Sequence, residues 1–318
     1  MTALEGARRP QPPGAGPGTA EPAPVADTGT EAGLVVRGPA NPPPEPPRHL
    51  RYRRHLHLWS ALRELWGARH ITRTLAERWI LVRYKQAFLG IAWVVITPLL
   101  YMVAFSLLFQ RVAKVDTGGV PYNLFVYVAL LPWMLFSSSV GSGGTSLLTN
   151  IPLLNKVYCP REVFPISFVA SAGVDFAIST GVLGLLFLIY RFPPAATAYW
   201  VPVLLGVLVM FTLGITLIIS ALVVYVRDLR QMVPMLLQIG IFATPVAWKF
   251  SQLSESGQVW YSLLNPLAPV IDGMRRCVLY GQAPRLVPLA VGAAAAAVWL
   301  LVGYLIFKRL ETGIADVA

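Results

Sequence analysis

Charged residues are scarce in this sequence. Asp, Glu, Lys and Arg make up 13% of its 318 residues, and hydrophobic types make up 55%, whereas about a quarter of a typical soluble domain is charged. Four uncharged stretches are long enough for a helix to cross the roughly 30 Å hydrocarbon core of a bilayer: residues 88–110, 117–155, 192–226 and 286–307. The scarcity of charge argues against a soluble protein and predicts a membrane protein with several spans.

Cysteine is also rare, and a nucleotide-binding loop is missing. Cys159 and Cys277 are far apart and fall on opposite sides of the predicted membrane, so we expect neither a disulfide nor a metal site. No Gly-x-x-x-x-Gly-Lys-[Ser/Thr] phosphate loop occurs, so we expect no cofactor on this chain, and any ATP must bind to another chain. The glycine-rich run 141–144 lies in an apolar stretch, where small residues favour close helix packing.

The N-terminal third of the chain changes character twice. Residues 1–47 are rich in Pro, Gly and Ala, a composition that predicts a disordered extension. Residues 48–85 combine many arginines with apolar residues at helical spacing (58, 59, 62, 65 and 66), which predicts an amphipathic helix in the membrane interface. We therefore place the membrane domain at residues 48–318.

The remaining pattern predicts an all-α membrane protein with six transmembrane helices. The expected spans are residues 88–110, 121–147, 164–190, 199–226, 231–249 and 286–308. The interrupted apolar segment 250–285 predicts short re-entrant helices between spans five and six. Such broken segments are tolerated at membrane depth only inside protein or beside water.

The distribution of Lys and Arg predicts the orientation. Sixteen of them lie in the segments at one end of the predicted spans and seven in the segments at the other end, 249–285 included. The excess marks the cytoplasmic side, so we expect both termini in the cytoplasm and the re-entrant helices outside. Because the basic residues flank the spans, the net charge of +11 does not indicate a nucleic-acid partner.

Polar residues within or beside the spans give the first candidate sites. Asp175 lies well inside a predicted span, where a charge costs about 2.5–3.5 kcal/mol on insertion scales. It is either a proton or substrate site or the acceptor of a structural hydrogen bond from a neighbouring helix. Two short cytoplasmic segments, 153–165 and 225–230, are either contact sites for a soluble partner or polar connections between spans.

Several short motifs occur in one order between residues 80 and 285. They are Arg-Tyr-Lys-Gln-Ala-Phe-Leu-Gly at 83–90, Leu-Pro-Trp at 131–133, Lys-Val-Tyr-Cys-Pro-Arg-Glu at 156–162, Val-Asp-Phe at 174–176, Val-Arg-Asp-Leu at 226–229, Leu-Leu-Gln at 236–238, Pro-Val at 245–246 and Leu-Asn-Pro-Leu-Ala-Pro at 264–269. Together they resemble the permease subunit of ABC-2 type transporters, specifically the O-antigen, teichoic-acid and capsular polysaccharide exporters. The Pro-rich N-terminal extension departs from the usual family pattern.

The resemblance implies a non-enzymatic transport subunit in a bacterial inner membrane. It implies a homodimer docked to two copies of a separate ABC ATPase, which carries ATP and Mg. It also implies that segment 155–163 is a coupling helix and that the substrate is a lipid-linked polysaccharide (O-antigen, teichoic acid or a galactan-like glycan). The candidate coupling residues are Asn155, Lys156, Tyr158, Arg161, Glu162, Arg227 and Asp228.

Two further groups are candidate substrate contacts. Arg83 and Lys85 lie where span one meets the cytoplasmic interface, and they are either ligands of a lipid diphosphate or anchors that set topology. Aromatic rings suit sugar faces, and the candidate conduit residues are Trp93, Tyr101, Phe105, Trp133 and Phe136. Such rings at helical spacing also occur as core or lipid contacts.

Two alternative functions stay open at this point. An ABC-2 exporter of a small drug or lipid would share the same motifs. A membrane glycosyltransferase would need loop carboxylates for a metal or a base, and the predicted loops contain few of them.

Overall fold

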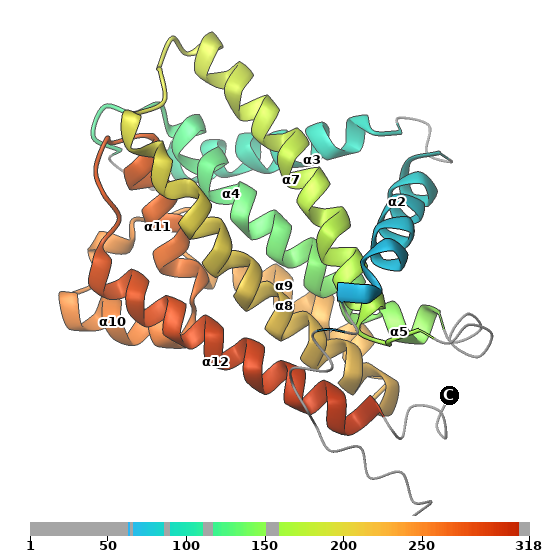
Figure 1. Cartoon of the computed structure of the whole chain (residues 1–318). Helices are drawn as coiled ribbons and strands as arrows, with labels where there is room; N and C mark the ends of the chain where they lie inside the picture. Colours follow the sequence, from blue (N-terminus) through green and yellow to red (C-terminus); the bar gives the residue numbers. More distant parts are fainter. Residues whose placement is uncertain (1–62, 64–65, 86–89, 111–116, 151–158, 312–318) are drawn as a thin grey trace, which may run out of the picture. The chain divides into compact units, whose positions relative to one another are not determined.

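The computed structural model describes residues 63, 66–85, 90–110, 117–150 and 159–311 (Figure 1). All regular structure within these ranges is helical, and they contain no strand. The helices are, in chain order, α2 (Arg69–Lys85), α3 (Ala92–Phe105), η1 (Ser106–Gln110), α4 (Tyr122–Ser138), η2 (Ser139–Gly143), α5 (Ser146–Thr149), α7 (Val163–Ile189), η3 (Ala196–Trp200), α8 (Val201–Tyr225), α9 (Leu229–Ala243), η4 (Phe250–Gln252), α10 (Glu255–Leu264), α11 (Leu267–Val278) and α12 (Leu286–Glu311).

Within the described part of the chain, five helical stretches are long and apolar enough to cross a membrane. They cover Ala92–Phe109, Tyr122–Gly143, Val163–Ile189, Ala196–Tyr225 and Leu286–Glu311. These correspond to the first four predicted spans and the last one. The prediction of an all-helical, multi-pass membrane protein is therefore confirmed for the described residues.

The predicted fifth span, 231–249, is shorter in the structure. α9 has 15 residues and ends at Ala243, which gives it a length of about 22 Å at 1.5 Å per residue. The next residue, Thr244, is extended (ψ 144°), as expected for a residue that precedes a proline. The described residues thus contain five long apolar helices and one apolar helix below the usual spanning length.

The segment expected to hold re-entrant helices, 250–285, consists of three short helices. η4, α10 and α11 have 3, 10 and 12 residues, and each is too short to cross a bilayer. The hydroxyl of Ser254 accepts a hydrogen bond from the backbone N–H of Gly257 (3.2 Å) and caps α10. The broken apolar pattern therefore corresponds to broken helical structure.

The predicted interface helix of residues 48–85 is represented by α2. Its buried Leu75 faces the bundle, and Trp79 stacks on Phe168 of α7 with ring centroids 4.5 Å apart. Apolar positions 58, 59, 62 and 65 lie outside the described residues, as does the extension 1–47. Within the described part, α2 packs along α7 (Figure 1).

Helix α4 forms the centre of the bundle. Residues 124–130 are each at most 1% exposed, and α4 contacts α3, α7, α8 and α11. A helix that is apolar all round is the type that can be enclosed by neighbours. α4 therefore provides the fixed element against which the other helices are arranged.

Glycines allow two very close helix contacts. α8 and α12 run side by side (Figure 1), and a methyl group at Gly214 would lie 2.6 Å from the backbone of Trp299. In the glycine-rich run 141–144, a methyl group at Gly144 would lie 2.6 Å from the Cγ2 of Ile219 in α8. The run is therefore a helix-packing element, as predicted.

Candidate functional site

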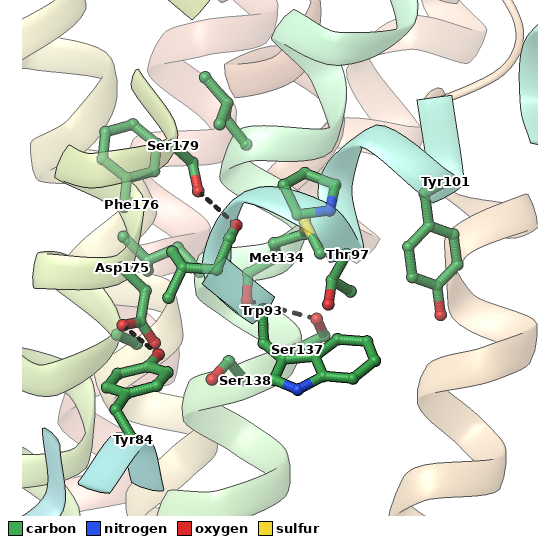
Figure 2. A pocket seen from close by; sticks show the side chains of 15 residues that line it. Tyr84, Trp93, Thr97, Tyr101, Met134, Ser137, Ser138, Asp175, Phe176 and Ser179 are labelled. Carbon is green, nitrogen blue, oxygen red and sulfur yellow. Dashed lines mark hydrogen bonds between the residues drawn. The ribbon is translucent and has the colours of Figure 1, made fainter. Parts of the chain in front are cut away.

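A cavity with a volume of about 470 Å³ lies between α2, α3, α4 and α7. Figure 2 shows that side chains from all four helices line it. Their polar members are hydroxyls and one carboxylate, and their apolar members include three aromatic rings besides that of Tyr84. The labelled lining residues are Tyr84, Trp93, Thr97, Tyr101, Met134, Ser137, Ser138, Asp175, Phe176 and Ser179.

Asp175 is held by a hydrogen bond from a different helix. The hydroxyl of Tyr84, at the end of α2, donates to Oδ1 of Asp175 in α7 over 2.8 Å (Figure 2). This bond joins residues 91 positions apart and fixes the end of α2 to the middle of α7. Of the two interpretations of Asp175, a structural hydrogen bond therefore has direct geometric support.

Two buried hydroxyl groups form hydrogen bonds between helices beside the cavity. Ser179 of α7 donates to the carbonyl of Val94 in α3 over 3.3 Å (Figure 2). The hydroxyl of Tyr127 in α4 donates to the carbonyl of Ser179 over 3.1 Å. These bonds connect α7 to α3 and to α4. Polar contacts as well as packing therefore fix the shape of the cavity.

Trp93 and Tyr101 present aromatic faces to the cavity from one side of α3. They lie eight residues apart, about two helical turns, with Thr97 midway between them. Trp93 and Tyr101 are 46% and 45% exposed, so their rings are available to a ligand. Aromatic rings among hydroxyls and a carboxylate form a surface that suits a sugar ring.

A second cavity, of about 400 Å³, lies between α3, α4 and α9. Tyr101 and Ser137 line both cavities, so the two adjoin. Phe105 and Trp133 line the second one, and Phe105 stacks on Tyr101 with centroids 6.5 Å apart. Four of the five candidate conduit aromatics therefore lie along one pair of adjoining cavities.

Phe136, the fifth, lies elsewhere. It is 8% exposed and stacks on Phe211 of α8 with centroids 5.4 Å apart and an interplanar angle of 4°. It lines a separate cavity of about 370 Å³ near α8 and α9, together with Trp133. Phe136 is thus placed mainly as a packing residue between α4 and α8.

The described coupling candidates fall into a buried set and an exposed set. Glu162 is 1% exposed and forms an ion pair with Lys308 of α12, which also pairs with Glu311 at 3.0 Å. Arg161 donates to the carbonyl of Glu311. Arg227 and Asp228 are exposed in the turn before α9. Asn155, Lys156 and Tyr158 lie outside the described residues.

Segments 153–165 and 225–230 both contact the same end of α12. Arg161 and Glu162 reach it as described, and the hydroxyl of Tyr225 donates to the carbonyl of Leu310 over 2.6 Å. Cys159 is half-buried next to this region; burial raises the pKa of its thiol, and the charge of Arg161 opposes that rise. The C-terminal end of α12 therefore links the two segments that we considered for partner contact.

The candidate diphosphate ligands lie in the last turn of α2. Lys85 is exposed, and the side chain of Arg83 lies outside the described part. Tyr84, between them, makes the bond to Asp175. The two basic residues therefore flank the position where α2 is fixed to α7.

Arg275 of α11 is a polar centre that the sequence did not reveal. It is 3% exposed, and its guanidinium donates to the carbonyls of Phe125 (3.0 Å), Pro245 (2.7 Å), Trp248 (3.1 Å) and Val246. The guanidinium also lies 3.5 Å from the centroid of the Phe125 ring. Arg275 thus connects α11 to α4 and to the segment after α9. The only sequence signal was a pair of arginines within an otherwise apolar segment.

No metal centre is found among the described residues, because they contain no group of three His, Cys, Asp or Glu side chains able to hold an ion. The geometry instead offers cavities bounded by aromatic rings and hydroxyls, with basic residues at both ends of the spans.

Comparison with known proteins agrees with these features. The family described as ABC-2 type transporter matches residues 71–279. The O-antigen export system permease protein RfbA of Myxococcus xanthus is 33% identical over 256 residues, which cover 80% of this chain and 98% of that protein. Two proteins of the same name from Klebsiella pneumoniae are 30% and 28% identical over 63% and 74% of this chain, and the matches cover 76% and 90% of their lengths.

Proposed function

Because the chain belongs to the ABC-2 type transporter family, we propose that it is the permease subunit of an exporter that carries a lipid-linked polysaccharide across the bacterial inner membrane. Similarity to the Myxococcus xanthus O-antigen export permease over 98% of that protein is the observation that carries this proposal. The glycan would be of the O-antigen type.

The energy for export would come from a separate ABC ATPase. The sequence contains no phosphate loop, so ATP and Mg would bind to the partner in two copies, one for each permease of a homodimer. Exposed apolar side chains on α3, η1 and α9 support the homodimer, since large apolar surfaces need a partner or lipid to cover them. They are Leu100 and Val103 on α3, Leu107 and Leu108 on η1, and Met232, Met235, Leu236, Ile239 and Phe242 on α9.

The membrane topology that fits this role has six spans and cytoplasmic termini. α9 would serve as the fifth span, and the residues that follow it would complete the crossing inside the protein, where a non-helical backbone can be satisfied. Arg275 satisfies three carbonyls of that segment. α10 and α11 would then be re-entrant on the outer side.

The glycan would follow the two adjoining cavities. Trp93 and Tyr101 would stack on sugar rings, and Phe105 and Trp133 would continue the apolar wall toward α9. Few charged groups line these cavities: Asp175 is the only one among their described lining residues. A polymer with many hydroxyls could therefore slide past without being trapped by strong ionic contacts.

The lipid diphosphate would first contact Arg83 and Lys85 at the cytoplasmic end of α2. Arginine binds phosphate oxygens through paired, charge-assisted hydrogen bonds. The bond between Tyr84 and Asp175 would hold these two residues beside the first cavity. The lipid headgroup would therefore bind beside the first cavity, where the glycan route begins.

ATP-driven movement would enter through segment 155–163 and the turn at Arg227 and Asp228. The exposed charges of that turn are accessible to a partner, whereas Glu162 is enclosed and paired with Lys308. In this scheme the first segment transmits force to α12 through its buried ion pair. A packed element with two discrete positions is what such coupling requires.

The proposed function can be tested with the permease and a candidate ABC ATPase from the same organism in vesicles. Lipid-linked polysaccharide should raise the ATP hydrolysis rate, and the ATPase should copurify with the permease. Stimulation by small drugs or simple lipids, with none by lipid-linked glycan, would instead favour the alternative of a drug or lipid exporter.

A further inference from the structure

A small cationic cavity lies between α4, α11, the segment before α10 and the segment after α11. Its volume is about 170 Å³. Four of its lining residues carry a positive charge, and one is a carboxylate. The full lining is Phe125, Lys249, Ser251, Asp272, Arg275, Arg276, Tyr280, Gln282 and Arg285. We name it the α11 cavity.

The described residues that line the α11 cavity include four cations and one carboxylate. Asp272 lies 3.7 Å from Nε of Arg285, and it is the sole carboxylate among the described residues that line the cavity. Arg275 donates to backbone carbonyls, which satisfy its N–H groups but carry no net charge. Burial lowers the pKa of Arg275 to about 9, while Asp272 opposes that shift, so the guanidinium stays positive at neutral pH.

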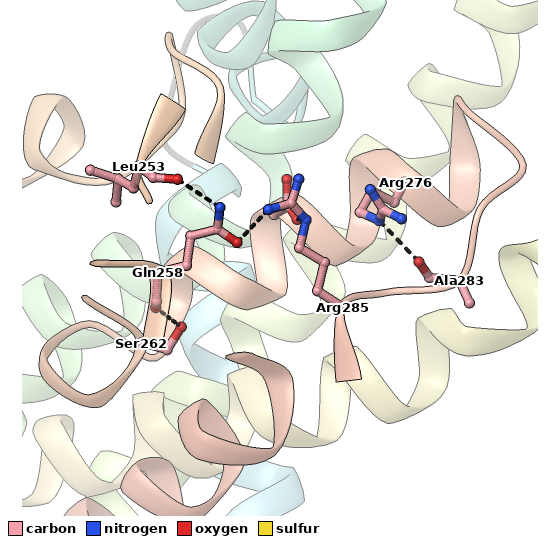
Figure 3. A network of polar contacts seen from close by, with 7 residues as sticks. Leu253, Gln258, Ser262, Arg276, Ala283 and Arg285 are labelled. Carbon is pink, nitrogen blue, oxygen red and sulfur yellow. Dashed lines mark hydrogen bonds and ion pairs between the residues drawn. The ribbon is translucent and has the colours of Figure 1, made fainter. Parts of the chain in front are cut away.

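Arg276 has donor groups that can bind a ligand. Arg276 donates from Nε to the carbonyl of Ala283 over 3.0 Å (Figure 3), a contact that uses only one of its three nitrogens. Arg276 and Lys249 are half-buried, and Ser251 and Gln282 are exposed, so the cavity is reached from solvent. Arginine forks are well matched to the oxygens of a phosphate group.

A network of polar contacts fixes Arg285 on one side of the α11 cavity. Figure 3 shows that Arg285 donates to the amide oxygen of Gln258, whose amide nitrogen donates to the carbonyl of Leu253 over 2.8 Å. Arg285 is therefore fixed both by Gln258 and by Asp272. A preorganised cation loses less conformational entropy when a ligand binds.

The cavity lies beside the start of a candidate span. Arg285 directly precedes Leu286, the first residue of a candidate span, and large apolar side chains nearby are exposed. Leu264 is 75% and Val287 64% exposed, as expected for surfaces that face lipid tails. A cationic recess beside such a surface is suited to the phosphates of lipids.

We propose that the α11 cavity holds a phosphate or diphosphate group of a lipid at the membrane face opposite the cytoplasm. This inference rests on the proposed function, because that function supplies both the orientation and a diphosphate-bearing lipid. The cavity would hold the headgroup after the glycan has crossed, at the other end of the protein from Arg83 and Lys85.

Binding can be measured on the full-length permease without any ATPase, in phosphatidylcholine nanodiscs. Three probes distinguish the source of the phosphate: undecaprenyl diphosphate, phosphatidylglycerol and sodium diphosphate. In the double variant Lys249→Gln/Arg276→Gln, Kd for the best-bound probe should rise at least tenfold, since each charge-assisted bond contributes about tenfold or more in affinity. The probe that shows the largest effect identifies the source.

Two controls keep the test specific. Arg191 is exposed outside the cavity, on the same proposed side of the membrane, and Arg191→Gln should leave Kd unchanged. Lys249→Arg/Arg276→Lys keeps both charges and should bind within about threefold of wild type. If the Gln double variant keeps its thermal stability and binds all three probes as wild type does, the inference is overturned.

The two proposals fail separately. Glycan export that persists without phosphate binding to the α11 cavity would remove only this inference. Charge-dependent phosphate binding by a permease that exports no glycan would remove the proposed function and leave the α11 cavity as a phosphate site.

Discussion

Replacing Lys308 should destabilise the protein more than replacing either of its acidic partners. Lys308 is 9% exposed and lies between Glu162, which is 1% exposed, and Glu311, at 3.0 Å. Lys308→Met would leave two enclosed carboxylates without their cation. Glu162→Gln would leave Lys308 still paired with Glu311.

The size of this asymmetry follows from the pairing. Removing one partner of a buried ion pair typically costs about 3–5 kcal/mol, and we expect that cost for Lys308→Met. Glu162→Gln should cost about 1–3 kcal/mol, the range for a single lost polar contact. The double variant should be less destabilised than the sum of the two single variants, with a coupling energy of about 0.5–3 kcal/mol.

The assay is thermal unfolding of the purified permease in detergent, with ATPase copurification as a second readout. Lys308→Met should lower the midpoint by roughly 10 °C and weaken copurification, because segment 155–163 would lose its attachment to α12. The exposed Arg191→Gln serves as the control and should change little, because Arg191 lies outside segments 153–165 and 225–230. Equal effects of the two single variants, or simple additivity in the double variant, would refute the reasoning.

Four further variants have expected outcomes. Gly303→Leu should destabilise by about 1–3 kcal/mol or more, because its side chain would clash with the carbonyl of Gly214. Gly206→Ala, which meets nothing within 4 Å, should be neutral or slightly stabilising in the same melting assay. Arg83→Ala with Lys85→Ala should leave membrane insertion intact but weaken the stimulation of ATP hydrolysis by lipid-linked glycan; unchanged stimulation would exclude a diphosphate contact there. Trp93→Ala should slow glycan export about threefold to tenfold through lost stacking without changing the melting temperature, and a normal export rate would exclude Trp93 from the route.

Long uncharged stretches predicted most of the fold because their length and composition depend only on local sequence. The five long helices fall within a few residues of the predicted spans. The end of α9 was predicted wrongly at residue 249, although Pro245 marked the change of backbone after Ala243. We extended the predicted span to residue 249 because the residues just after Pro245 are mostly apolar.

The site was predicted less completely, because its contacts join distant segments. Trp93 and Tyr101 could be grouped by helical spacing alone, and the structure places both in one cavity. The bond from Tyr84 to Asp175 spans 91 positions and that from Arg275 to Phe125 spans 150. No local pattern specifies such partners, so the role of Arg275 became evident only from the packed helices.

The central claim is that this chain is the route by which a lipid-linked polysaccharide leaves the cytoplasm. The most direct measurement is the surface polysaccharide of the source cell after deletion of the gene. Surface polymer should disappear while polymer on its polyprenyl diphosphate accumulates inside, and expression of the wild-type chain should reverse both changes. Normal surface polymer in the deletion strain, with no accumulation inside, would contradict the account.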